Sequence, residues 1–323
     1  MKGQSNPQLG FGDDAVLRRV PDDHFLMQVE RQIDWRVLEA LLGAAYAPIG
    51  RGSAPPLVCL KMLLLEHWFD LSDPACEAAC RDRLSFMRFL GLGLSDAVPD
   101  ETTLSRFRKR LREADLDECL FEEVNRQLQA RNLMIKRGTL IDATIVESAR
   151  KPPMPGKAHD SADAEAGFAV HKAKAVKHGY KYHVAVDHQS ELVRAAIVTP
   201  GQVHDSRIAE HLIQFDEQAV YADKAYDDAE RRLLLKHAGI EDGILHKAYR
   251  NRPLTAQQRQ RNRMLMPIRA NVERVFADWK CRRSLARCRY VGLRQNQTHA
   301  WLLAMAHNLR RLVVLSTPQA QGG

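Results

Sequence analysis

The sequence predicts an α/β protein in which an all-helical region precedes a mixed sheet flanked by helices. Two observations lead to this prediction, and a third concerns the binding partner. Up to about residue 135, apolar residues recur at helical spacing, and Pro, Gly and Asp mark the ends of the segments. From Gly138 onward, β-branched runs alternate with helical segments. The third observation is a strongly basic stretch over residues 247–315.

We expect a flexible leader over residues 1–20 and a helical domain over residues 21–135. Helices are expected at 22–46, from Pro56 to about 69, from Ser72, and at 82–90, 100–112 and 115–131. A short helix, a glycine-containing turn and the basic segment VPDETTLSRFRKRL are typical of a helix-turn-helix. In that interpretation Arg106 and Arg108 are expected to contact DNA.

The C-terminal part is expected to hold a mixed sheet. Strands are predicted at 138–149, 180–188, 191–201, 218–226 and 240–246, and helices at 204–215, 227–239, from Pro267, and at 296–315, with loops over 150–178 and 247–266. Three antiparallel strands followed by alternating helices and parallel strands fit an RNase H-like core. We expect this domain at 136–316 and a disordered tail at 317–323.

Charge is distributed unevenly along the chain. The net charge is +8, but residues 247–315 hold 14 Arg and 2 Lys against one Glu and one Asp, so the remainder is acidic. Arginine grips phosphate bidentately, so this stretch indicates a polyanionic partner such as nucleic acid. The six cysteines form no zinc-ligand pattern and are expected to be reduced. No apolar run is long enough to span a bilayer, and we expect a cytoplasmic protein.

Asp142 is the first candidate functional residue. It lies in a predicted strand that is apolar on both faces, where a carboxylate is costly unless it is paired or binds a cation. The simpler alternative is a buried Asp held by a nearby Arg or by backbone amides.

Asp223 and Glu273 complete a candidate set of three carboxylates. Asp223 ends a predicted strand, at the sheet edge where ligands bind in α/β proteins, although it is equally suited to cap a turn. Glu273 is predicted to point along the seam between helix and sheet, with Arg269 and Lys280 a turn away on either side. The common alternative for Glu273 is a surface ion pair with Arg269. Together the three suit two Mg²⁺ ions that activate a phosphodiester.

The sequence resembles the DDE transposases of bacterial insertion sequences, most closely the insertion-sequence-five family. The segments LSDPACEAACRDRLSFMRFLGL, IDATIVES, VYADKAYDD and NVERVFADWK carry the resemblance. The spacing of Arg269, Glu273 and Lys280 matches that group's signature, but Met266 stands at its Tyr position.

The resemblance implies catalytic and metal-binding roles for Asp142, Asp223 and Glu273, with two Mg²⁺ ions for which Mn²⁺ can substitute. It implies DNA contacts by Arg269 and Lys280, and Lys224 is a further candidate. The expected partners are double-stranded DNA of the transposon ends and target, and further copies of the chain in a dimer or larger assembly. The protein is then expected near the bacterial nucleoid, with no membrane association.

Two alternatives remain at this point. The first is a domesticated RNase H-like endonuclease that cleaves DNA without strand transfer. The second is a repressor that binds inverted repeats and in which the carboxylates are structural.

Overall fold

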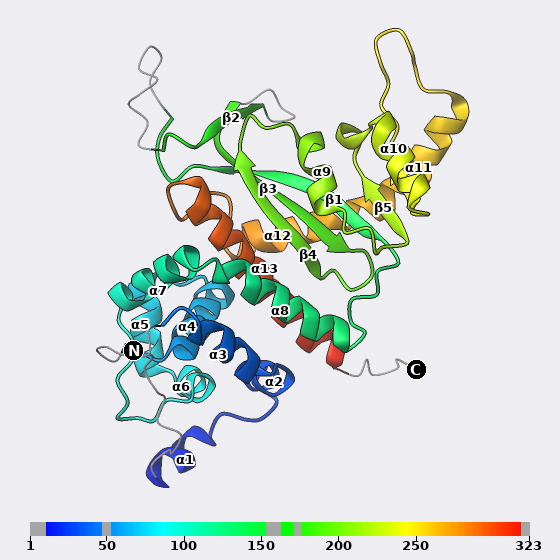
Figure 1. Ribbon diagram of the computed structural model, residues 1–323. Coiled ribbons are helices and arrows are strands. Elements are labelled where there is room, and N and C mark those ends of the chain that lie inside the picture. The colour runs from blue at the N-terminus through cyan, green and yellow to red at the C-terminus, as the bar shows by residue number, and fades with distance from the viewer. Residues whose placement is uncertain (1–10, 47–52, 153–162, 171–175, 318–323) are drawn as a thin grey trace. The chain divides into compact units, whose positions relative to one another are not determined.

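The computed structural model describes residues 11–46, 53–152, 163–170 and 176–317 (Figure 1). The chain divides into two compact units, one formed by Met1–Arg131 with Trp301–Gly323 and the other by Asn132–Ala300. Of the helices in the described ranges, none is long and apolar enough to cross a membrane. The leader expected at 1–20 contains a short helix, and its first ten residues, like 318–323 of the expected tail, lie outside the described residues.

Within the residues that the structure describes, the regular structure of the first unit is helical. Helix α4 (Pro56–Phe69) lies at its centre, because twelve of its fourteen residues are buried. The indole nitrogen of Trp68 on α4 donates to the carbonyl oxygen of Ala306 over 2.8 Å, which fixes the C-terminal part of α13 (Leu293–Ser316) in this unit. The other helices are α1 (Phe11–Leu17), α2 (Phe25–Gln32), α3 (Trp35–Gly43), α5 (Asp73–Asp82), α6 (Leu84–Leu90), α7 (Glu101–Glu113) and α8 (Leu116–Ala130), with α4 at Pro56–Phe69.

The helix predicted at 22–46 is divided into α2 and α3. Ile33 leaves the helical backbone with φ −114° and ψ 135°, and the side chain of Asp34 then caps α3 by accepting from the amide of Arg36. The polar capping residue therefore outweighs the continuous apolar spacing. The predicted cap of α7 is present, since the carboxylate of Asp100 accepts from the Thr103 amide over 2.6 Å.

Arg108 is buried, in contrast to the DNA contact expected of it. Its side chain is 7% exposed, and its guanidinium binds Glu66 of α4 over 3.3 Å and also Asp73 of α5. These ion pairs tie α4 and α5 to α7, and they compensate the burial of the Glu66 carboxylate. Arg106, on the same helix, is exposed. The expectation for Arg108 is therefore corrected to a structural role.

We predict that Arg108→Met lowers the free energy of unfolding by about 3–5 kcal/mol, because Glu66 is then buried without the guanidinium. Urea unfolding of the full chain, followed by circular dichroism, measures this loss. Arg106→Met is the matched control and is expected to change stability by less than about 0.5 kcal/mol. Equal stability of the two variants would contradict the structural role of Arg108.

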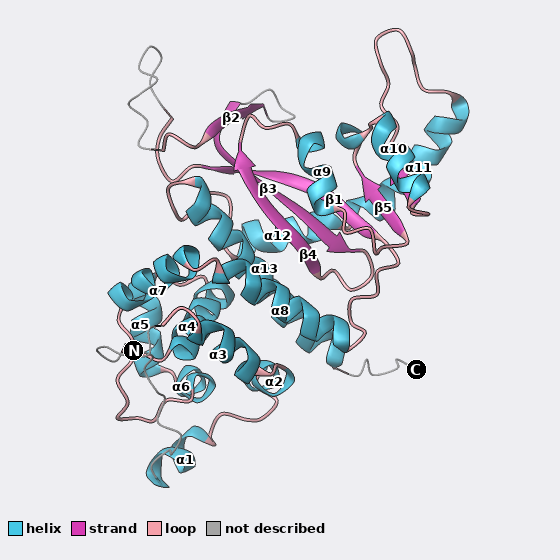
Figure 2. Cartoon of the chain, viewed as in Figure 1, coloured by secondary structure: helices cyan, strands magenta, loops and turns pink. Residues whose placement is uncertain are grey.

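The second unit is built on a mixed sheet, as the α/β prediction requires (Figure 2). Antiparallel pairs join β1 to β3, and β3 to both β2 and β4, while β1, β5 and β6 run parallel. The short strand β2 falls in the segment expected to be a loop. The strands are β1 (Thr139–Glu147), β2 (Gly167–Val170), β3 (Val176–Asp187), β4 (Val193–Pro200), β5 (Ala219–Ala222) and β6 (Glu241–Ile244).

Helices cover both faces of this sheet, with α9 in front of it and α12 behind it in Figure 1. The first turns of α13 lie along β4, where the side-chain amide of Gln297 accepts from the Val198 amide over 2.7 Å and donates to the Ala196 carbonyl over 2.9 Å. The remaining elements are the 3-10 turns η1 (Asp205–Ile208) and η2 (Lys224–Tyr226) and the helices α9 (Ala209–Leu212), α10 (Ala229–His237), α11 (Ala256–Ala270) and α12 (Val272–Arg282).

The predicted loop at 247–266 is wrong over most of its length. Helix α11 begins at Ala256, where the side chains of Thr255 and Gln258 form a reciprocal capping box. Pro267 therefore lies inside the last turn of α11 and does not open a helix. The break comes after Ala270, and α12 carries the chain onward.

The buried imidazole of His183 predicts a pH dependence of stability. Burial lowers the pKa of His183 to about 4 from an ordinary value of 6.5. The folded state then stays neutral where the unfolded chain takes up a proton, so stability is lost as pH falls from about 6.5 towards 4. We expect a loss of up to about 1.4 kcal/mol per pH unit in that window. Urea unfolding at pH 7 and at pH 5 measures this loss of unfolding free energy, which is expected to be smaller in His183→Gln than in the wild type. Equal losses in the two proteins would show that His183 is not the cause.

Candidate functional site

The site lies where the short strand β5 ends beside the longer strand β1. The parallel register pairs Ile141 with Ala222, the last residue of β5. The next residues along the two strands are Asp142 and Asp223, so the register brings two carboxylates side by side at the carboxyl end of β5. Beyond this point β5 no longer pairs with β1, and the next backbone partner of β1 on that side is Arg287, opposite Glu147. Between them, residues 142–145 line a cavity of about 430 Å³.

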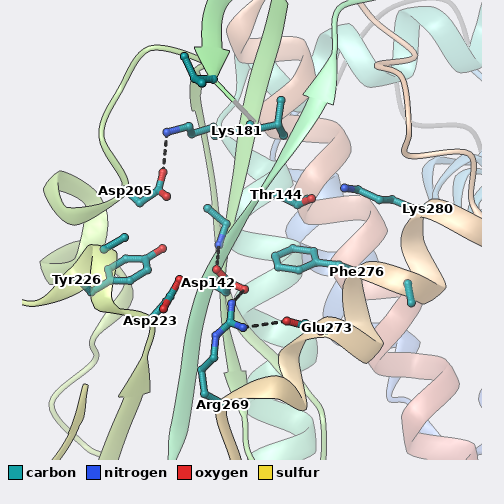
Figure 3. Close-up of a pocket in the computed structure, with 15 residues that line it drawn as sticks. Asp142, Thr144, Lys181, Asp205, Asp223, Tyr226, Arg269, Glu273, Phe276 and Lys280 are labelled. Carbon is teal, nitrogen blue, oxygen red and sulfur yellow. Dashed lines mark hydrogen bonds and ion pairs between the residues drawn. The ribbon is translucent and has the colours of Figure 1, made fainter. Parts of the chain in front are cut away.

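The same cavity receives Glu273 from α12, so the three predicted carboxylates line one space (Figure 3). Asp142 lies at the centre of the view, with Asp205, Tyr226 and Asp223 on one side and Glu273, Phe276 and Lys280 on the other. Residues from β1, η1, η2, α11 and α12 therefore converge here, although they are up to about 140 positions apart in the sequence.

Asp142 is held in place by two donors. Its Oδ1 atom accepts from the amide of Ala143 over 2.9 Å, and its Oδ2 atom accepts from Nη2 of Arg269 over 2.5 Å. The side chain is 15% exposed. The carboxylate is thus largely shielded from water but open to the cavity on one side.

Asp223 begins the 3-10 turn η2, and its Oδ1 atom accepts from the amide of Lys224 over 2.7 Å. This is the capping role considered above, and the same side chain also lines the cavity. Lys224 is exposed and is not among the residues that line the cavity. The turn therefore directs Asp223 towards the site and Lys224 towards solvent.

Arg269 connects the first and third carboxylates. Its guanidinium donates to Glu273 Oε1 over 2.8 Å as well as to Asp142, and its side chain is 11% exposed while that of Glu273 is 60% exposed. Burial lowers the pKa of Arg269, but the charges of Asp142, Asp223 and Glu273 outweigh burial and raise it overall. Arg269 is consequently a permanent cation at the centre of an acidic cavity.

Lys280 reaches the cavity from the far end of α12. Burial, together with the charge of Lys177, lowers the pKa of its ammonium group, and the charge of Asp142 opposes this shift. With Arg269, it places a second basic group along the wall of the cavity, where an anionic ligand would meet it.

Lys181 and Tyr226 are among the residues that line the cavity without having been indicated by the sequence pattern. Lys181 of β3 donates to Asp205 over 2.7 Å, and Tyr226 is 1% exposed. Tyr226 was placed within a predicted strand over 218–226, but the chain turns at Asp223, and η2 returns the ring to the cavity. The sequence signal that could have identified Tyr226 is its position three residues after Asp223, which caps the turn. The cap of η1 is His204, which leaves Asp205 to face the cavity.

The chemistry of the cavity suits a hard divalent cation. Among the described residues, no three His, Cys, Asp or Glu side chains stand close enough to hold a metal ion together. A guanidinium instead lies between Asp142 and Glu273, which shows that these carboxylates already hold a cation. Carboxylate oxygens are the ligands that Mg²⁺ prefers, so Asp142, Asp223 and Glu273 offer the donor type that such an ion takes, although in this structure their donors are Arg269 and backbone amides.

Comparison with known proteins identifies the family. Residues 134–309 match the family model described as "Transposase DDE domain", and residues 14–110 match the one described as "Transposase domain (DUF772)". The first match covers more than half of the chain and contains every residue of the cavity described above. The chain therefore belongs to the DDE-domain transposase family, a family of nucleases and strand transferases.

Among solved structures, the chain is similar to a piggyBac transposase, determined by cryo-electron microscopy as a synaptic complex with hairpin DNA. The similarity covers 98% of this chain and 77% of that chain, with 10% sequence identity and a TM-score of 0.41.

We predict that Arg269→Met makes the protein depend on divalent metal for stability. Without the guanidinium, the carboxylates repel one another, and the free energy of unfolding in EDTA is expected to fall by about 2 kcal/mol. Added Mg²⁺ is expected to restore more stability to this variant than it adds to the wild type, because a ligand of the folded state stabilises it by mass action. Thermal unfolding in EDTA and in about 10 mM Mg²⁺ measures both effects.

Arg274→Met is the matched control for this prediction. Arg274 lies on α12 close to Glu273, but its side chain is 71% exposed and pairs with Glu191. It is expected to behave as the wild type in both conditions. An equal response to Mg²⁺ in all three proteins would contradict a cation-binding role for the cavity.

Proposed function

We propose that this protein is the transposase of an insertion sequence of the insertion-sequence-five type. It binds the terminal inverted repeats, cleaves the DNA ends and joins the freed 3′-hydroxyls to target DNA. The observation that carries the proposal is the convergence of Asp142, Asp223 and Glu273 on one cavity that also contains Arg269 and Lys280.

The strand order supports an RNase H-like core for this enzyme. Apart from the short strand β2, the sheet runs β4-β3-β1-β5-β6, with its first three strands antiparallel and its last three parallel. The first carboxylate lies on the central strand β1, and the second follows β5 directly. This arrangement is the one that the order of elements in the sequence predicts.

In the proposed reaction, Asp142, Asp223 and Glu273 hold two Mg²⁺ ions, or Mn²⁺ in their place. Bound divalent cations supply Lewis acidity to a phosphodiester and lower the pKa of bound water. The three carboxylates belong to different elements, so their mutual positions depend on the fold of the whole unit. Glu273 is the most exposed of the three.

Four basic residues, three at the cavity and one in the first unit, are proposed to bind DNA. Arg269 and Lys280 line it, Lys224 is exposed beside it, and Arg106 is exposed on α7 of the first unit. When a phosphate enters, Arg269 can exchange its bonds to carboxylates for bonds to phosphate, which guanidinium groups bind bidentately. The same movement frees Asp142 and Glu273 for metal.

The chemistry proceeds in two displacements at phosphorus. Water first attacks the phosphodiester at each end of the element, and the P–O bond to the 3′-oxygen breaks, leaving a 3′-hydroxyl. That hydroxyl then attacks a target phosphodiester, so that one P–O bond forms as another breaks. Because the two ends must be held together for paired joining, we propose a dimer or a larger assembly on DNA.

The proposal is tested with purified protein and labelled DNA that carries the terminal sequences of the element encoding it. We predict that cleavage and joining require Mg²⁺, and that Asp142→Asn, Asp223→Asn and Glu273→Gln each lower both rates by at least about 1,000-fold. Binding to the same DNA in Ca²⁺, followed by gel shift, is expected to remain. Glu191→Gln, outside the cavity, is the control and is expected to retain activity.

The outcomes separate the proposed function from its alternatives. Cleavage without joining, under conditions where both ends are present, would identify a nuclease that does not transpose. Specific binding without cleavage in any divalent metal would identify a repressor. Cleavage by the Asp142→Asn variant at the wild-type rate would show that the catalytic centre lies elsewhere.

A further inference from the structure

Tyr226 brings an unpartnered polar group into the cavity. The ring packs in the apolar core formed by residues such as Leu212, Ile213 and Leu235, and the whole residue is 1% exposed. Its hydroxyl oxygen is buried and has no hydrogen-bond partner among the residues that the structure describes. In Figure 3 the hydroxyl points towards the space bounded by Asp142, Asp205 and Asp223. A buried hydroxyl without a partner costs about 1–3 kcal/mol, so its presence here requires an explanation.

The neighbouring carboxylates do not supply the missing partner, although they surround the hydroxyl. Asp142 binds the Arg269 guanidinium, Asp205 binds the Lys181 ammonium, and Asp223 binds the Lys224 amide. Each carboxylate is therefore oriented by a donor of its own. None of them accepts a hydrogen bond from the Tyr226 hydroxyl, so an acceptor that arrives with the ligand of the cavity can supply its missing partner.

A DNA phosphate is the ligand whose chemistry fits best. Its non-bridging oxygens accept hydrogen bonds, and repulsion from four carboxylates opposes its entry, so a neutral donor helps to hold it there. A Lys or Arg at this position would compete with divalent cations for the carboxylates, as Arg269 does, whereas a phenol adds no charge. The surrounding core residues also hold the ring in one position, so its hydroxyl suits a ligand atom with a defined position.

We propose that the hydroxyl of Tyr226 donates a hydrogen bond to a non-bridging oxygen of the scissile phosphate, which makes Tyr226 a catalytic residue in addition to the three carboxylates. This inference rests on the proposed function, since it takes the cavity to be the place where a phosphodiester is cut. The donor is aimed at an oxygen that gains negative charge as the nucleophile approaches phosphorus, and it stabilises that charge.

The tyrosine acts as a donor and does not become a nucleophile. Burial and the charges of Asp142, Asp205 and Asp223 raise the pKa of Tyr226 well above its ordinary value, so the phenol keeps its proton at neutral pH. No covalent bond to DNA forms through it, and no proton is transferred in the step.

The experiment compares wild type, Tyr226→Phe and Tyr221→Phe on the same DNA ends. Tyr226→Phe keeps the ring in the core and removes only the hydroxyl, so its thermal unfolding temperature is expected to match the wild type or exceed it. Tyr221 lies on β5 but does not line the cavity, which makes Tyr221→Phe the matched control. We expect Tyr226→Phe to slow cleavage by about 100-fold, with binding of the ends in Ca²⁺ changed by less than about 3-fold.

A sulfur substitution identifies the atom that is contacted. Each non-bridging oxygen of the scissile phosphate is replaced by sulfur in turn, and cleavage is measured in Mn²⁺, which tolerates sulfur ligands better than Mg²⁺. For one of the two diastereomers, sulfur is expected to slow the wild type but to have little further effect on Tyr226→Phe, because the hydrogen bond is already lost.

Several results would overturn the inference. If the wild type cleaves and Tyr226→Phe cleaves equally fast, the hydroxyl has no catalytic role, although the proposed function stands. If the variant is slow but shows the full sulfur effect for both diastereomers, the hydroxyl contacts another group. If the wild type does not cleave, the proposed function itself fails and the inference fails with it.

Discussion

The early end of β5 is the constraint on which the rest of the site depends. Because β5 stops at Ala222 while β1 continues to Glu147, β1 lacks a paired strand on the β5 side from Asp142 until Glu147 bridges to Arg287. Side chains from turns and helices fill the space that a longer strand would occupy. An extension of β5 by a few residues would close the cavity and turn Asp223 into an ordinary strand residue.

The charges of the site are balanced within the protein before any ligand is present. Arg269 neutralises part of the charge on Asp142 and Glu273, and Lys181 does the same for Asp205. The simpler structural explanations for the three carboxylates are therefore realised: an Arg partner for Asp142, a turn cap for Asp223 and an ion pair for Glu273. These contacts do not exclude a metal-binding role, because carboxylates that attract metal ions also form ion pairs with nearby Arg and Lys side chains.

Much of the fold could be predicted from the sequence, because the spacing of apolar residues and the capping of helices are local properties. The helix α4, the cap at Asp100 and the strands β1, β3 and β4 follow from apolar spacing and β-branched runs. The division of residues 22–46 and the start of α11 depended on single capping residues, Asp34 and Thr255, which apolar spacing does not reveal.

The sequence also predicted part of the candidate site. The convergence of Asp142, Asp223 and Glu273 on one cavity agrees with the prediction, while their catalytic roles stay a prediction. Tyr226 was missed because its position depends on how β5 ends and on which ring faces the core. The burial of Arg108 was missed for a related reason: its partners, Glu66 and Asp73, lie 42 and 35 positions earlier in the chain.

The contact of Gln297 with β4 has a consequence for the behaviour of the sheet towards other molecules. A strand at the margin of a sheet exposes amide and carbonyl groups that invite pairing with a foreign strand. Here the carboxamide of Gln297 satisfies the amide of Val198 and the carbonyl of Ala196, as a neighbouring peptide unit would. This part of the margin is therefore closed to strand addition, which protects the folded protein from aggregating through it.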